Sequence, residues 1–166
     1  MRTLIAIVIV SLPLTIAAQP LATELDDEIM DNVSVEYVEC AAYFAVVQEG
    51  LSKSESPVVA AKYGEASDKA AQFGLLAAQQ SRSEEMATKV TLARFEISLK
   101  AMRQTIENNY SNTALLSSKY SDNCVEAMAD SAAMLNRWTE KITSTYEKAE
   151  QKKARTLRGR GAKGPG

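Results

Sequence analysis

The sequence predicts an all-α fold, an antiparallel four-helix bundle with up-down-up-down connections. The first observation is composition: glycine and proline are scarce, with 7 and 4 among 166 residues, while strong helix formers such as alanine, leucine, glutamate and lysine are plentiful. The second is that apolar residues recur at spacings of three and four along most of the chain. The third is that only short polar segments separate these runs, so consecutive helices are expected to lie antiparallel.

The first helix is expected to begin near Asn32 or Ser34, because either side chain can cap a helix N-terminus. It should continue to about residue 51, with one apolar face turned to the core. The residues of this face are Tyr37, Cys40, Phe44, Val47 and Leu51.

The second helix is expected to start at Ser56 and Pro57, an N-cap followed by proline at the first helical position, and to end near Gln80. Small residues fall at every fourth position along it. They are Ala66, Ala70, Gly74 and Ala78. Such a ridge lets another helix approach closely. We expect it to pack inside the domain, and a homodimer surface is the alternative.

The third helix should begin at a capping box formed by Ser81 and Glu84 and run to about Asn109. The fourth should begin near Thr113 and continue to about residue 152, with a weak point at residues 121–123 where it could bend. The apolar stripe of this last helix consists of Cys124, Met128, Ser131, Leu135, Trp138 and Ile142.

Cys40 and Cys124 are the only cysteines, and both lie on the core stripe of their helix. Each is expected about 11 residues, or about 16 Å, from the same end of the bundle, because an α-helix rises 1.5 Å per residue. The first and fourth helices are neighbours in the simplest bundle, so the two thiols can meet at one level. The sequence therefore predicts one disulfide that staples the first helix to the fourth.

Residues 1–18 are expected to be a cleavable signal peptide, in which Arg2 precedes an apolar stretch of about 15 residues that is short for a membrane span. Ala18 supplies the small residue before the cut, and Gln19 would be the first mature residue. Cleavage after Ala22 and retention as a membrane anchor are the alternatives. The mature protein is expected in the periplasm of a Gram-negative cell or, otherwise, outside the cell, with no transmembrane segment.

Charge divides the mature chain into an acidic lead-in over residues 19–33, the helical bundle over 34–152 and a basic tail over 153–166 that is expected to be disordered. Lead-in and tail should lie at the same end of the bundle and partly neutralise each other. The tail is interpreted as a solvated helix end or as a contact for an anionic envelope component. Binding of nucleic acid is the least favoured interpretation, and no such partner is expected. The basic residues concerned are Lys152, Lys153, Arg155, Arg158, Arg160 and Lys163.

The sequence contains no histidine. This excludes a Ser-His-Asp triad, a histidine zinc site and a haem held by histidine. No phosphate-binding or nucleophile motif is present, and the methionines are interpreted as core filling rather than as copper ligands. We therefore expect no enzyme activity, no cofactor and no metal.

Two functions remain. The first is a non-catalytic interaction module of the cell envelope that binds an unknown protein or an anionic component. The second is a binder of small apolar ligands, with a cavity lined by Phe44, Phe95, Trp138 or Tyr146. A helix face left apolar after packing would favour the first, and a cavity of at least about 300 Å³ inside the core would favour the second.

Overall fold

Five α-helices and one short 3₁₀ helix make up the chain that the computed structural model describes, which is residues 19–53 and 56–161, with side chains over 23–53 and 56–156. Their bounds are α1 Gln19–Lys53, α2 Pro57–Ala78, α3 Glu84–Thr105, η1 Tyr110–Asn112, α4 Thr113–Ala129 and α5 Ser131–Gly161. These ranges contain no strand, so the all-α prediction is confirmed. The expected signal peptide lies outside the described residues.

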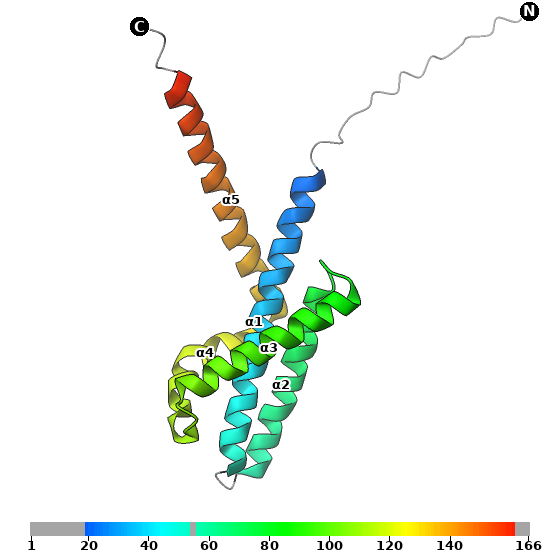
Figure 1. Cartoon of the computed structure of the whole chain (residues 1–166), viewed down its shortest axis with the longest axis vertical. Coiled ribbons are helices and arrows are strands. Elements are labelled where there is room, and N and C mark those ends of the chain that lie inside the picture. Colours follow the sequence, from blue (N-terminus) through cyan, green and yellow to red (C-terminus); the bar gives the residue numbers. More distant parts are fainter. Residues whose placement is uncertain (1–18, 54–55, 162–166) are drawn as a thin grey trace, which may run out of the picture.

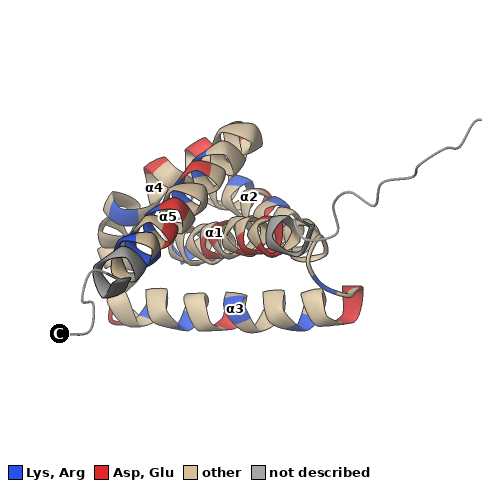
Figure 2. Ribbon diagram, turned by 90° about the horizontal axis from the view of Figure 1, so that it is seen from above, with Lys and Arg blue, Asp and Glu red and all other residues tan. Residues whose placement is uncertain are grey.

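Helix α1 is the centre of the fold, because each of the other four α-helices packs against it. Its longest contact is with α2, which follows it as an antiparallel partner (Figure 1). Seen along the molecule, α3 lies on one side of α1, and α4 and α5 lie on the other (Figure 2). The expected topology of four consecutive antiparallel helices is therefore not confirmed: the described chain has five α-helices, and four of them pack against the first.

The acidic lead-in over residues 19–33 is not a loose segment, because α1 is helical from Gln19 onwards. The reason is a second apolar face that is hidden among the acidic residues. Ile29 and Val33, four positions apart, are each 5% exposed and belong to the same buried cluster as Ile142 of α5. Burial of this face supports helix where the charge pattern alone suggested none.

The long fourth helix is divided in two, at Asp130 and not at residues 121–123, which are helical within α4. Asp130 leaves the helical region with φ −141° and ψ 88°. Its side-chain oxygen accepts a hydrogen bond from the backbone N–H of Ala133 at 2.9 Å, which caps the start of α5. Asp130 therefore both ends one helix and begins the next, in a new direction.

Helix α5 continues beyond residue 152 as far as Gly161, so most of the basic tail is helical rather than disordered. Extending a helix that has already formed costs little when the added residues are alanine, glutamine, lysine and arginine, as they mainly are over residues 149–158. Lys163 lies outside the described residues.

The core is built on small residues that bring α1 and α2 close together. Ala41, Ala70 and Ala78 are fully buried, and a Cβ added to Gly74 would lie 2.8 Å from Cγ2 of Val38. The ridge of small residues on α2 therefore packs against α1 within the chain, as expected for the first of its two interpretations. Ser67 adds a buried hydrogen bond between the two helices.

The predicted disulfide is confirmed, because Cys40 of α1 and Cys124 of α4 are bonded with their Cα atoms 5.3 Å apart.

The start of α3 differs from prediction. Its N-cap is Ser83 and not Ser81, and the Ser83 hydroxyl accepts a hydrogen bond from the N–H of Met86. The same helix ends before Asn109, because Asn108 and its predecessor have positive φ.

Candidate functional site

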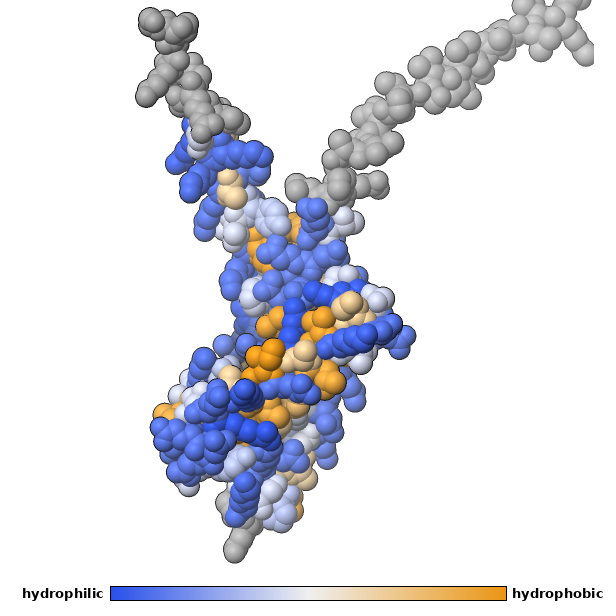
Figure 3. All heavy atoms as spheres, in the orientation of Figure 1, coloured by the Kyte–Doolittle hydropathy of each residue, from blue (hydrophilic) through white to orange (hydrophobic). Residues whose placement is uncertain are grey.

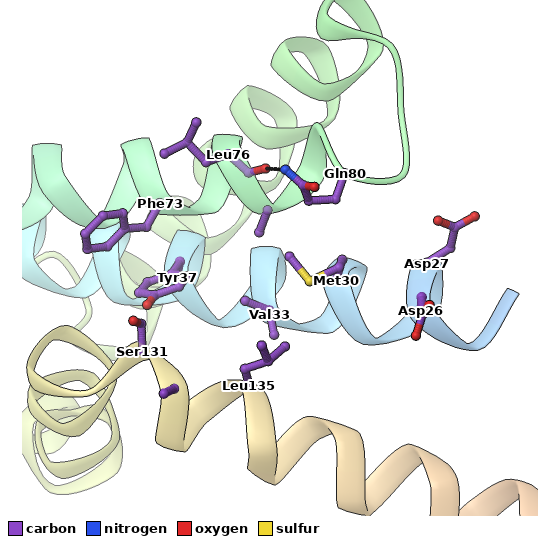
Figure 4. Close-up of a pocket in the computed structure, with 12 residues that line it drawn as sticks. Asp26, Asp27, Met30, Val33, Tyr37, Phe73, Leu76, Gln80, Ser131 and Leu135 are labelled. Carbon is purple, nitrogen blue, oxygen red and sulfur yellow. Dashed lines mark hydrogen bonds between the residues drawn. The ribbon is translucent and has the colours of Figure 1, made fainter. Parts of the chain in front are cut away.

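The main surface feature is an open groove of about 630 Å³ where α5 leaves the side of α1, which we call the fork groove. It is lined by α1, α2 and the first turns of α5. In Figure 1 helices α1 and α5 diverge in a V, with one end of α2 near its base, and Figure 4 shows the side chains that line the groove.

The floor and walls of the fork groove are apolar. Val33 and Tyr37 of α1 form the floor, and the Tyr37 ring lies 5.2 Å from the ring of Phe73 on α2. Two leucines on opposite walls remain accessible: Leu76 is 55% exposed and Leu135 is 39% exposed. Exposed apolar side chains grouped around one groove are typical of a contact surface.

Negative charge lies at one end of the fork groove, near the start of α1. Asp26 and Asp27 are exposed there, and Figure 4 shows both beyond Met30. No lysine or arginine is found among the described residues that line the groove. The groove therefore combines an apolar floor with an anionic end, and its field favours a ligand that carries positive charge there.

Contacts between α1 and α5 fix the shape of the fork. The Trp138 indole donates to Glu36 at 2.6 Å, and Arg137 pairs with the same carboxylate. About two turns further along α5, the Tyr146 hydroxyl donates to Glu28 at 2.8 Å. A carboxylate held by an arginine and an indole is a directional contact, so the angle of α5 against α1 is specified.

Several acidic residues of α1 hold other parts of the chain. The Asp31 carboxylate forms ion pairs with Arg82 at 2.6 Å and with Arg94 of α3 at 2.8 Å. Partial burial acts to raise the pKa of Asp31, but the hydrogen bonds and charges of Arg94 and Arg82 outweigh it and hold that pKa below its usual value. At the far end of α1, Glu49 is held in the same way by Arg103 and Tyr110.

The basic residues predicted for an anionic contact lie at the free end of α5, from residue 147 to 161, which we call the basic arm. Lys152, Lys153 and Arg155 are exposed, as is every described side chain from 147 to 156. Figure 3 shows this arm as almost entirely hydrophilic. For Arg158 and Arg160 only the helical backbone is described.

The basic arm and the start of α1 do lie at the same end of the molecule (Figure 1). However, no ion pair joins them in the described part of the chain, where the pairing of Lys153 is with Glu150 at 3.8 Å. The two arms diverge instead of neutralising each other.

The four aromatic residues expected to line one cavity lie in different places. Phe44 is buried in the core next to the disulfide, and Phe95 borders a shallow depression between α2 and α3. Trp138 lines a separate cleft between α1, α4 and α5, and Tyr146 packs against the start of α1.

Sequence reasoning missed the residues of the fork groove. Leu135 was placed on the core stripe, and the bend at Asp130 turns it toward the groove instead. Leu75 and Leu76 are adjacent, so they cannot share one face of α2. This was the one signal that an apolar side chain would remain outside the core.

No group of three or more potential metal-ligating side chains occurs in the part of the chain that the structure describes. Over the same residues, no helix is both long and apolar enough to cross a bilayer. Over its described residues the chain is all-helical, stapled by one disulfide, and has an open apolar groove on its surface. Comparison with family models, with curated proteins and with solved structures gave no match.

Proposed function

We propose that this protein is an exported, non-catalytic interaction module of the cell envelope, and that the fork groove holds an apolar helical segment of a partner protein. The observation that carries the proposal is the exposure of Leu76 on α2 and Leu135 on α5, which both line one groove. Folding leaves these side chains in water, and a partner that covers both gains the free energy of burying them.

The form of the groove favours a helix over a small molecule. The groove is open along its length, and its apolar residues come from three helices rather than from an enclosed core cavity. An amphipathic helix laid into an apolar groove is a common mode of recognition. Asp26 and Asp27 add a preference for a segment with lysine or arginine near that end.

The basic arm supports the envelope half of the proposal. Every side chain over residues 147–156 of α5 is exposed. This part of the helix is polar on all sides, so it has no apolar face that would pack against another helix. Lys152, Lys153 and Arg155 are exposed, and their contact with an anionic lipid or polymer leaves the groove free.

The groove is tested with a fluorescein-labelled amphipathic helical peptide of leucine and lysine, titrated with the mature protein at low salt. We expect saturable binding that the double variant Leu76→Asp/Leu135→Asp weakens at least about tenfold, as loss of central apolar contacts usually does. The matched control is Ile97→Asp, an exposed apolar residue on α3, which should bind like the wild type.

Two results would contradict the groove proposal. Equal binding of a leucine and glutamate peptide would exclude the role of the anionic end. Equal loss in Ile97→Asp would show that any exposed apolar residue suffices. If a small apolar dye saturates the groove and no peptide does, the alternative of a small apolar-ligand binder is favoured.

The basic arm is tested by sedimentation with vesicles that contain anionic lipid. The triple variant Lys152→Gln/Lys153→Gln/Arg155→Gln should lose most of the binding at low salt, and the wild type should lose it as salt is raised. A triple variant at Lys62, Lys89 and Lys100, exposed lysines elsewhere, has the same change in charge and should bind normally. Equal loss in both variants would refute a specific role of the arm.

Export predicts that the protein recovered outside the cytoplasm begins at Gln19, and an intact N-terminus there would refute cleavage.

A further inference from the structure

A second opening, the polar cleft, lies between α1, α4 and α5 and has a volume of about 480 Å³. It shares no lining residue with the fork groove. The disulfide between Cys40 and Cys124 forms part of its wall, and Trp138 and Tyr120 contribute aromatic surface. Because the disulfide ties α1 to α4 at this level, the spacing of these two helices beside the cleft is fixed covalently.

Two of the charged groups in the polar cleft already satisfy each other. The carboxylate of Glu36 is held by Arg137 and by the Trp138 indole, and Arg137 also reaches Glu126 at 3.2 Å. This pair is a structural contact between α1 and α5, and it leaves neither group in need of a ligand.

Three other charges in the polar cleft lack a direct ion pair: the exposed Lys119 and Lys141, and Glu39, although Lys119 attracts Glu39 electrostatically and has a hydrogen bond with the Tyr120 side chain. Over the described residues, neither Lys119 nor Lys141 has a carboxylate within ion-pair distance, and no hydrogen bond reaches the side chain of Glu39. The two ammonium groups lie over aromatic faces instead. Lys119 is 4.8 Å from the centre of the Tyr120 ring, and Lys141 is 4.1 Å from that of Trp138.

Glu39 lies in an unfavourable position for a charged group. It is half-buried on the face of α1 that borders the cleft, and desolvation raises its pKa even though Lys119 attracts it electrostatically. A half-buried carboxylate without a hydrogen-bond donor is destabilising in the unliganded protein. Such groups concentrate at binding sites, where the ligand supplies the missing partner.

We infer that the polar cleft binds a small zwitterion with one ammonium group and two carboxylates, the charge pattern of an acidic amino acid. The ammonium group pairs with Glu39, and the carboxylates pair with Lys119 and Lys141. This arrangement complements two positive charges and one negative charge in the cleft. The aliphatic part of the ligand lies between the rings of Tyr120 and Trp138.

Trp138 makes the inference directly measurable, because it is the only tryptophan in the chain. The probe is L-glutamate, titrated into the mature, oxidised protein while tryptophan emission is recorded and heat is measured in parallel. We expect a saturable change in emission. Glutarate, which lacks the ammonium group, and L-glutamine, which lacks the second carboxylate, should each bind at least about tenfold more weakly, a difference of about 1.4 kcal/mol.

Variants assign each contact to its residue. Glu39→Gln should weaken binding of L-glutamate but not that of glutarate, whereas Lys119→Gln and Lys141→Gln should weaken both. Lys100→Gln, an exposed lysine on α3, is the matched control and should bind as the wild type does.

The inference is overturned if L-glutamate gives no saturable signal by emission or heat, or if Lys100→Gln loses as much binding as Lys119→Gln. It is also overturned if glutarate binds as well as L-glutamate to the wild type. The double variant Leu76→Asp/Leu135→Asp should keep the L-glutamate signal, so this outcome is independent of the function proposed for the fork groove.

Discussion

Two glycines of α2 offer a matched test of how closely α1 and α2 pack. Gly64 and Gly74 both lie within the helix, and glycine in a helix interior is about 1 kcal/mol less favourable than alanine. A Cβ at Gly64 would meet the amide nitrogen of Gln48 at 2.8 Å, the far end of a flexible side chain that can move. A Cβ at Gly74 would meet Cγ2 of Val38 at 2.8 Å, on a short side chain fixed in the core.

The two substitutions should therefore differ in sign. We expect Gly64→Ala to stabilise the protein by up to about 1 kcal/mol, the gain in helix propensity. Gly74→Ala has the same gain but overpacks the core, which typically costs about 1–3 kcal/mol, so a net loss of about 0–2 kcal/mol is expected. Urea unfolding followed by circular dichroism at 222 nm measures both. If Gly74→Ala is as stable as Gly64→Ala, the helices are not in the close contact described.

Three further predictions concern covalent and electrostatic stability. Reduction of the Cys40–Cys124 disulfide, which spans 84 residues, should lower the free energy of unfolding by about 4.5 kcal/mol; an unchanged urea midpoint in reductant would contradict this. Asp31 and Glu49 have lowered pKa values, so their contribution is present above the usual carboxyl range and is lost as pH falls below about 4. Asp31→Asn should remove part of that loss in acid-unfolding curves, and a curve identical to the wild type would refute its role. Glu39 has a raised pKa, so its ionised form opposes folding at neutral pH, and Glu39→Gln should raise stability at pH 7 but not in acid. A variant less stable than the wild type at pH 7 would contradict this.

Periodicity was sufficient to predict the helical class and the disulfide. Cys40 and Cys124 are the only cysteines and stand on apolar stripes of their helices, so they could be paired although the four-helix topology used to compare their heights was not confirmed. The start of α1 was missed because its apolar face, with Ile29 and Val33, is interrupted by acidic residues that dominate the composition. One of those acids, Asp31, binds Arg94 of α3, and such pairing over 63 residues leaves no local sequence pattern.

The fork groove could not be predicted, because it depends on an angle between helices. A stripe shows which residues face a neighbour, but the direction of α5 is set by the backbone of Asp130 and by the contact of Glu36 with Trp138. Leu135 is apolar in either arrangement. Only the bend decides whether it enters the core or remains on a wall of the groove.

The central position of α1 has a consequence for the order in which the molecule is completed. α1 is the first of the described helices in the chain, and every later helix packs on it, so each one finds its docking surface already synthesised. The disulfide cannot form until Cys124 has been synthesised, which is after α1, α2, α3 and much of α4. Oxidation is thus a late event in maturation. A free thiol would mark a chain that has not been finished, and a quality-control protease or oxidase could distinguish the two states by that feature alone.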